Sequence, residues 1–244
     1  MEKLKTLRDK TGAGMADCKM ALDEAGGDID KAVEILRKKG MAKAAKRSER
    51  ETSEGVVKVA LSGDAKTGYI VEINAETDFV VRSEKFQEFT EKEMKLIMEK
   101  QPKDLAELMS LNIGANTVKE NLDSLSGVIG EKLDIKRYGL LKSAGTVAVY
   151  SHLGGKIGVL VALDKEGQSD IAYDVAMQIA AANPKYIYPE DVLAEEINKE
   201  KEIYKAQLFK EGKPENMIDK IMQGKLAKFY EEVCLLKQEY IKDD

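Results

Sequence analysis

Histidine, cysteine and tryptophan are scarce in this chain of 244 residues, which has one histidine, two cysteines and no tryptophan. A single histidine excludes zinc sites built on several histidines, and Cys18 and Cys234 form no Cys-x-x-Cys pair. The Gly-x-Ser-x-Gly pattern of many hydrolases is also missing. We therefore expect no catalytic constellation, no metal site and no cofactor. Two distant, unpaired cysteines are typical of a reduced, cytoplasmic protein.

Long apolar runs and a uniformly basic charge are missing as well. No stretch approaches the roughly 18 apolar residues of a membrane-spanning helix, and the first residues lack the apolar core of a signal peptide. Residues 1–50 carry 13 lysines and arginines against 9 acidic residues, whereas the whole chain has 39 against 44. A basic head on an acidic body argues against a protein that binds membranes or nucleic acid as a whole.

Residues 1–46 are predicted to form a compact bundle of three helices. Gly12 and Gly14 separate the first two helices, Asp28 is placed to cap the start of the third, and Gly40 is placed to end it. Apolar residues recur at helical spacing in each helix: Leu4 and Leu7 in the first, Met15, Cys18, Leu22 and Ala25 in the second, and Ile29, Ala32, Val33 and Leu36 in the third.

Residues 38–50 hold six basic residues and one acidic residue. One interpretation is an arm that contacts RNA. The favoured interpretation is a solvated helix that runs into a linker over residues 47–54, because charge runs usually cover solvated faces.

The middle of the chain repeats the order strand, glycine-bounded turn, strand, helix. The first hairpin spans residues 57–74, and the second spans residues 146–163 and leads into a helix with Ile171, Val175 and Ile179 on one face. We therefore predict an α+β fold with two related subdomains, at 55–140 and 141–190, each a small antiparallel sheet covered by helix.

The last part of the chain is predicted to be an antiparallel helical hairpin over residues 191–236, followed by a tail at 237–244. Pro189 precedes the first helix, and the segment 211–214 (Glu-Gly-Lys-Pro) breaks the chain before the second. Its high charge predicts that the hairpin serves either as a contact arm or as a homodimer element.

The segment Glu76-Thr77-Asp78-Phe79-Val80 lies where the first hairpin ends and a helix opening at Ser83 is predicted. Spacing alone favours Phe79 buried under the sheet and Asp78 capping the following turn. His152, at the end of a strand, is by the same standard a rim histidine satisfied by local hydrogen bonds.

Several segments carry a recognisable pattern, in order along the chain: residues 7–22 (with Thr11-Gly12-Ala13-Gly14-Met15), 27–29, 36–40, 76–80, 152–161 and 174–180, and Lys213-Pro214 with Phe229. Together they resemble the bacterial elongation factor Ts family. The resemblance implies a guanine-nucleotide exchange factor for elongation factor Tu whose first domain is a ubiquitin-associated-like module. Longer members of the family continue beyond the hairpin into a closing strand and a helical module, so we expect this chain to be either a shorter form or one truncated after Asp244.

The resemblance also implies roles for particular residues. Asp78 and Phe79, with Thr77 and Val80, would form an exposed wedge that intrudes beside the partner's magnesium and switch region. His152 would press on the partner and disturb its phosphate loop. Further partner contacts fall on Ile129 and Gly130 and, in the N-terminal module, on Arg8, Met15 and Met20.

The alternative is a ubiquitin-associated-like adaptor, whose N-terminal bundle binds a protein partner without nucleotide exchange. Deleting residues 1–50 would separate the two hypotheses, since an adaptor would lose all binding whereas an exchange factor would keep residual activity in its core. RNA binding through residues 38–50 would give a steep salt dependence of affinity. A hydrolase is the weakest hypothesis because the chain lacks the residues for one.

Overall fold

The computed structural model describes residues 1–242 and mixes helices with antiparallel sheets, which confirms the predicted α+β class. The chain forms two compact units that divide after Ser169. Residues 243–244 of the predicted tail lie outside the described residues.

The first unit contains α1 (Glu2–Thr11), α2 (Met15–Glu24), α3 (Ile29–Ala45), β1 (Glu54–Leu61), β2 (Thr67–Ala75), α4 (Asp78–Val81), α5 (Glu84–Lys100), α6 (Leu105–Ser110), β3 (Asn112–Ile113), β4 (Asn116–Thr117), α7 (Val118–Ile129), β5 (Leu133–Lys142), β6 (Thr146–His152) and β7 (Ile157–Leu163). In the second are nearly all of α8 (Ser169–Ala182), the 3₁₀ turn Pro189–Asp191, α9 (Ala194–Lys210), α10 (Glu215–Val233) and the 3₁₀ turn Leu235–Lys237.

The three N-terminal helices share a small apolar core. Leu7, Cys18 and Ala32 are completely buried at its centre, as the helical spacing predicted, but Met15 is 47% exposed. Asp28 caps α3 as predicted, because its Oδ1 accepts hydrogen bonds from the backbone N–H groups of Asp30 (2.9 Å) and Lys31 (3.0 Å). The bundle therefore places Met15 outside its core, on the surface of α2.

The sequence predicted that the third helix ends at Gly40, but this is wrong: the helix continues to Ala45. Gly40 lies where α3 crosses α7, and a Cβ atom added to Gly127 of α7 would stand 2.5 Å from the Gly40 Cα atom. Glycine at position 127 allows the backbones to approach this closely, whereas a Cβ atom added at Gly40 would have its nearest neighbour, in Ser124, at 3.7 Å. Gly40 thus serves a helix–helix contact instead of a helix end, and spacing along one helix could not distinguish the two.

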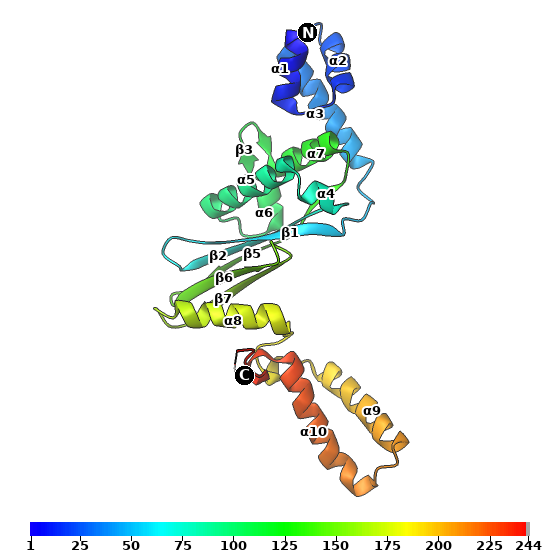
Figure 1. The fold of residues 1–244 in the computed structure, drawn as a ribbon, viewed down its shortest axis with the longest axis vertical. Helices are drawn as coiled ribbons and strands as arrows, with labels where there is room; N and C mark the ends of the chain where they lie inside the picture. The colour runs from blue at the N-terminus through cyan, green and yellow to red at the C-terminus, as the bar shows by residue number, and fades with distance from the viewer. Residues whose placement is uncertain (243–244) are drawn as a thin grey trace. The chain divides into compact units, whose positions relative to one another are not determined.

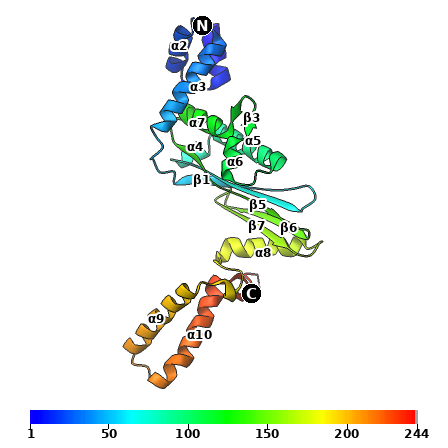
Figure 2. The ribbon, with the colours of Figure 1, turned by 180° about the vertical axis from the view of Figure 1, so that it is seen from behind.

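The central sheet has the strand order β1–β2–β5, with both neighbouring pairs antiparallel. Helices α4 to α7 cover one of its faces (Figures 1 and 2). Alternate residues of β2, including Tyr69, Val71 and Ile73, point into the core on that side and pack with Phe86 and Ile97 of α5. This period-two burial fits a strand with one face against helices. The sheet thereby fixes the end of β2, where the segment 76–80 begins.

The second hairpin, β6–β7, lies on the other face of the central sheet (Figure 1). Gly158 of β7 faces Val57 and Val59 of β1, and an added Cβ at Gly158 would come within 2.5 Å of a Val57 methyl group. Gly155, in the β6–β7 turn, accepts a 2.6 Å hydrogen bond from the backbone N–H of Val57. Close backbone approach therefore joins the hairpin to the outer strand of the sheet.

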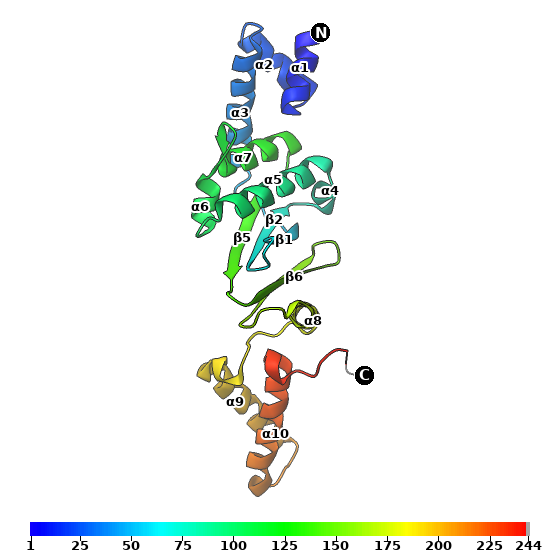
Figure 3. The same ribbon diagram turned by 90° about the vertical axis from the view of Figure 1, so that its left-hand side faces the viewer.

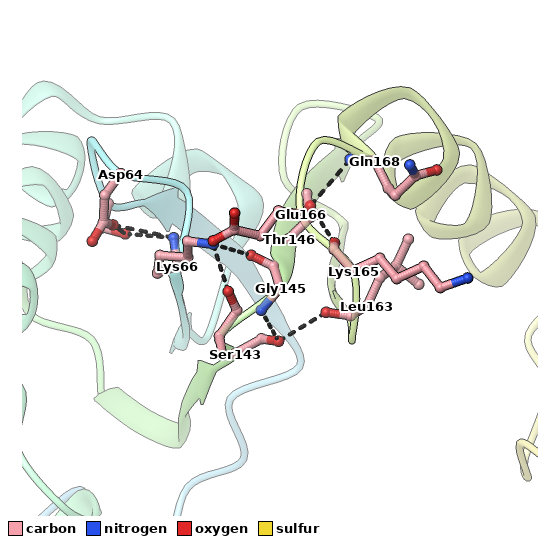
Figure 4. Close-up of polar contacts among 11 residues, drawn as sticks. Asp64, Lys66, Ser143, Gly145, Thr146, Leu163, Lys165, Glu166 and Gln168 are labelled. Carbon is pink, nitrogen blue, oxygen red and sulfur yellow. Dashed lines mark hydrogen bonds and ion pairs between the residues drawn. The ribbon is translucent and has the colours of Figure 1, made fainter.

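The turn between β1 and β2 is tied to the start of β6 by Lys66 (Figure 4). The Lys66 Nζ donates to the backbone oxygens of Ala144 (2.5 Å) and Gly145 (2.6 Å), and to the Glu166 carboxylate (2.6 Å). One ammonium group thus satisfies three acceptors from the connections on either side of the β6–β7 hairpin, and it lowers the pKa of Glu166 by donating to it.

The second unit contains a helical hairpin in which α9 and α10 run antiparallel (Figure 3). Its first helix begins at Ala194, not near Asp191 as predicted, because Pro189–Asp191 forms a separate 3₁₀ turn. Tyr186 joins the end of α10 through a bridge to Cys234 and donates its hydroxyl to Glu196 at 2.7 Å. In α8 the buried positions are Ala172, Ala176 and Gln178, whereas Ile171, predicted on the buried face, is exposed. Two alanines and a glutamine, not large aliphatic residues, are therefore the buried residues of α8.

Candidate partner-binding site

The segment after β2 forms the short helix α4, and Thr77 caps it. The Thr77 Oγ1 accepts the Val80 backbone N–H at 3.5 Å, so the expectation that Asp78 is the cap is wrong. Asp78 instead occupies the first helical position, where a negative charge is favourable. It pairs with Arg82 one turn later, at 3.0 Å; the Arg82 side chain is mostly exposed and the Asp78 side chain is partly exposed. Asp78 thus presents a carboxylate at the surface.

Phe79 projects into solvent, with 82% of its surface exposed. Its neighbour Val80 is partly buried and packs against the main core, and Val81 is buried. The expectation from spacing that Phe79 lies under the sheet is therefore wrong, and the exposure implied by the family resemblance is confirmed. A phenylalanine that leaves so much apolar surface in water is uncommon and marks a candidate contact site.

Glu131 holds this segment in place. Its carboxylate accepts the Thr77 backbone N–H at 3.0 Å with one oxygen and the Thr77 hydroxyl at 2.8 Å with the other. Glu131 follows Gly130, which ends α7 with a φ of 94° in the left-handed region. The structure thus brings the predicted residues Ile129 and Gly130 next to Thr77. Ile129 itself is partly buried against the core.

The sequence analysis did not single out Glu131, although it directly follows the Ile-Gly pair that was selected. The sequence signal for Glu131 was a carboxylate that follows a glycine at the end of a helix. Its hydrogen-bond partner, Thr77, lies 54 residues earlier, and a single sequence does not reveal such a pairing.

Glu76 makes a second link between the same two segments. It accepts the Lys132 backbone N–H at 2.6 Å and the Arg50 guanidinium at 3.1 Å. These contacts, the Lys132 hydrogen bond first, hold the pKa of Glu76 below its usual value. Glu76 and Glu131 therefore join the start of the Phe79 segment, residues 76–77, to the residues that follow α7, 131–132.

Several residues of the basic stretch 38–50 are engaged within the protein. Lys39 pairs with Glu24 at 2.7 Å and Lys43 pairs with Asp17 at 3.1 Å. Arg47 donates to the backbone oxygen of Ser126 at 3.2 Å, and Arg50 binds Glu76 as described. The stretch therefore acts within the fold, as helix α3 and its link to α7, which favours the interpretation of a helix and linker over an RNA arm.

His152 ends β6, pairs with Ile157 across the hairpin and is half-buried. Its Nδ1 lies 2.9 Å from the Tyr150 hydroxyl, and the two rings stack at a centroid distance of 5.8 Å. The next residue, Leu153, is 71% exposed at a left-handed φ of 50°. Sequence analysis missed Leu153, although a leucine before two glycines in a turn is a signal for an exposed apolar tip.

The three partner-contact residues predicted in the N-terminal module are on α1 and α2. Arg8 is exposed, and Met15 and Met20 are 47% and 53% exposed. The α1–α2 loop is linked to the rest of the unit by Lys85, whose Nζ donates to the Gly12 backbone oxygen at 3.0 Å. An exposed methionine pair suits a contact surface, since methionine adapts to different partner shapes.

Two kinds of feature are absent from residues 1–242. No group of three or more histidine, cysteine, aspartate or glutamate side chains among them is placed to hold a metal ion. No helix in this part of the chain is both long enough and apolar enough to cross a membrane. The exposed apolar and charged side chains described above are therefore the candidate site.

Comparisons with known proteins place these features in one group. The profile of the family described as Elongation factor TS matches residues 76–244. An elongation factor Ts of Nautilia profundicola is 49% identical, covering 98% of this chain and 80% of its own length. Those of Nitratiruptor sp. (48%) and Prosthecochloris aestuarii (46%) cover 99% and 98% of this chain, and 82% and 86% of their own lengths. The family profile begins at Glu76, the first residue of the candidate site.

Proposed function

Because this chain belongs to the elongation factor Ts family, the translation factors that exchange guanine nucleotide on elongation factor Tu, we propose that it releases GDP through the Thr77–Val80 segment and His152. The observation that carries the proposal is the 82% exposure of Phe79 on a segment held by Glu131. Phe79 enters an apolar pocket of the partner, and Asp78 brings a negative charge beside the partner's magnesium and switch region.

Nucleotide exchange of this kind requires no catalytic residue. The factor must bind the nucleotide-free partner more tightly than the nucleotide-bound one, and linkage makes the effect reciprocal. Burial of one phenylalanine supplies roughly 1.5–3 kcal/mol, and typical coupling energies are about 1–3 kcal/mol. A coupling energy above this range requires several contacts acting together, and His152, with the exposed Leu153 beside it, supplies a separate contact at the partner's phosphate loop.

The remaining contacts and assignments belong to the same proposal. Ile129 and Gly130 make a further contact with the partner, and Arg8, Met15 and Met20 form a docking surface on the ubiquitin-associated-like module. The two sheet-and-helix parts are related subdomains, and the helical hairpin is a contact or homodimer arm. The protein acts in the cytoplasm and binds no nucleic acid directly.

The deciding experiment is release of a fluorescent GDP analogue from purified elongation factor Tu. Catalytic amounts of this protein should accelerate release, and a double variant, Asp78→Asn with Phe79→Ala, should lose most of that acceleration while binding of the N-terminal module is retained. Unchanged release with the double variant would refute the roles of Asp78 and Phe79. No acceleration by the wild-type protein would refute the exchange function itself.

A further inference from the structure

A cavity of about 400 Å³ lies within the first unit, between the α1–α2 connection and helices α5 and α7. Its lining includes the apolar side chains of Phe89, Ile113, Leu125 and Val128, and the polar side chains of Asn121 and Ser124. The cavity contains none of the residues assigned to partner binding. Five charged residues complete the lining with Thr11 and Gly12, so the cavity combines apolar walls with many polar groups. Apolar walls with convergent polar groups are features of small-molecule sites.

Glu93 of α5 belongs to the lining of this cavity and is completely buried. Among the described residues, neither of its carboxylate oxygens has a hydrogen-bond partner. A buried carboxylate without donors is costly, because burial removes water without supplying a replacement. The same burial raises the pKa of Glu93 to about 7. The side chain is therefore a strong acceptor that lacks a donor.

The other charged side chains of the lining balance one another. Asp9 and Glu88 carry negative charges, and Lys85 and Lys92 carry positive ones. Lys85 is already engaged with the Gly12 backbone oxygen. When Glu93 is ionised, the site therefore has one uncompensated negative charge, which a single positive charge would neutralise.

The geometry of the acceptor and the size of the cavity define the ligand further. Two unpaired carboxylate oxygens suit a head with several N–H donors, such as a guanidinium, which can contact both. The volume exceeds that of a bare ammonium ion and the apolar walls suit a short aliphatic stem. We propose that the cavity binds a small organic monocation whose guanidinium or ammonium head pairs with Glu93.

Because Glu93 has no exposed surface, a ligand reaches its carboxylate only when the side chains around it and at the rim move aside. Lys92 and Glu88 are 3.9 Å apart, with 66% and 59% of their side chains exposed. An exposed pair of this kind contributes little to stability, so its separation costs little.

The test is an amide NMR titration of the full chain with ethylguanidinium chloride and, in parallel, with its uncharged isostere N-ethylurea. Saturable shifts are expected at residues of α5 and α7 around the cavity with ethylguanidinium only. Glu93→Gln should weaken binding by about tenfold or more, since a charge-assisted pair is lost. Glu99→Gln, at an exposed position of the same helix outside the cavity lining, is the matched control and should change affinity by less than about threefold.

A pH series separates the Glu93 interaction from general attraction of cations. Affinity should fall as the pH is lowered from 8 to 6, since a proton then competes for Glu93, and this dependence should vanish in Glu93→Gln. Thermal unfolding of each variant shows whether it is folded. The proposal is overturned by any of three results: no saturable shifts, equal binding of ethylguanidinium and N-ethylurea, or unchanged affinity in folded Glu93→Gln.

Discussion

Glu131 holds Thr77 with both of its carboxylate oxygens, one on the backbone N–H at 3.0 Å and one on the hydroxyl at 2.8 Å. The pair joins the end of α7 to the residue that caps α4. Since Phe79 lies two residues beyond Thr77, the Glu131 carboxylate helps to fix where the Phe79 ring projects into solvent.

Glu131→Gln should reduce exchange activity without touching the proposed contact surface. The new amide NH₂ group faces a donor, so at least one hydrogen bond to Thr77 is lost, at a cost of about 1–2 kcal/mol in the free energy of unfolding. Nucleotide release and urea unfolding measure the two effects. Glu120→Gln is the control: Glu120 accepts the Thr117 backbone N–H at 3.0 Å in the capping box of α7. If both variants slow release equally, loss of stability, not loss of the Thr77 contact, explains the effect.

Phe79→Ala should slow GDP release by roughly tenfold to a hundredfold, as expected for the loss of one buried aromatic contact with the partner. The melting temperature of the free protein should stay nearly constant, because the ring is 82% exposed. Phe209→Ala, at a 52% exposed phenylalanine of α9, is a control matched in residue type. A large drop in melting temperature for Phe79→Ala would contradict the exposed position of the ring.

His152→Ala should also slow GDP release, and Tyr150→Phe should have a smaller effect in the same direction. The Tyr150 hydroxyl lies 2.9 Å from the His152 Nδ1, so its removal frees the imidazole to rotate without deleting it. Release rates of the two single variants and the double variant form the test. If the double variant is slower than His152→Ala alone, Tyr150 acts on its own and does not simply orient His152.

Gly127→Ala should destabilise the first unit by roughly 1–3 kcal/mol, because its Cβ would stand 2.5 Å from the Gly40 Cα, where two backbones meet. Gly40→Ala should instead stabilise the first unit. The nearest atom to its added Cβ is the Ser124 Cα at 3.7 Å, an ordinary contact, and alanine favours the helix by about 1 kcal/mol. Denaturant unfolding should therefore shift the two midpoints in opposite directions. Equal destabilisation would mean that the crossing is closer than the structure places it.

Glu93 should make stability fall as the pH rises from 4.5 to 7. Its pKa is raised from 4.5 to about 7 in the folded protein, so in this range the folded state holds a proton that the unfolded state has lost. The difference in unfolding free energy between Glu93→Gln and wild type should grow in favour of the variant by roughly 3 kcal/mol across this range. Glu88→Gln, with an exposed side chain, should follow the wild-type curve. A constant difference between Glu93→Gln and wild type would contradict the burial of an unpaired carboxyl group.

Local patterns predicted the elements well, because they depend on neighbours in sequence. The buried helical positions Leu7, Cys18 and Ala32 follow from three- and four-residue spacing, and the Asp28 cap follows from residue type. The failures concern contacts between distant segments. Gly40 has the residue type of a helix end but serves a crossing with α7, which depends on Gly127, 87 positions later in the printed sequence.

The family resemblance predicted the exposed position of Phe79, whereas residue spacing alone predicted a buried one. Burial rules place a phenylalanine at the end of a strand inside, since they treat apolar surface as something to be covered by the same chain. Phe79 departs from that rule because Val80 and Val81 already provide the apolar contacts of α4. Only the resemblance over the whole chain identified the outward side chain, and neither route found Glu131.

Helix α3 takes part in two sets of contacts. Its first half completes the core of the N-terminal bundle, and its second half lies against α7. The N-terminal bundle is therefore joined to α7 by one continuous helix and not by an extended linker. Helix α3 contacts α7, and α7 leads into Glu131, which holds Thr77. One continuous set of contacts within the first unit therefore runs from the N-terminal bundle to the residue that caps α4.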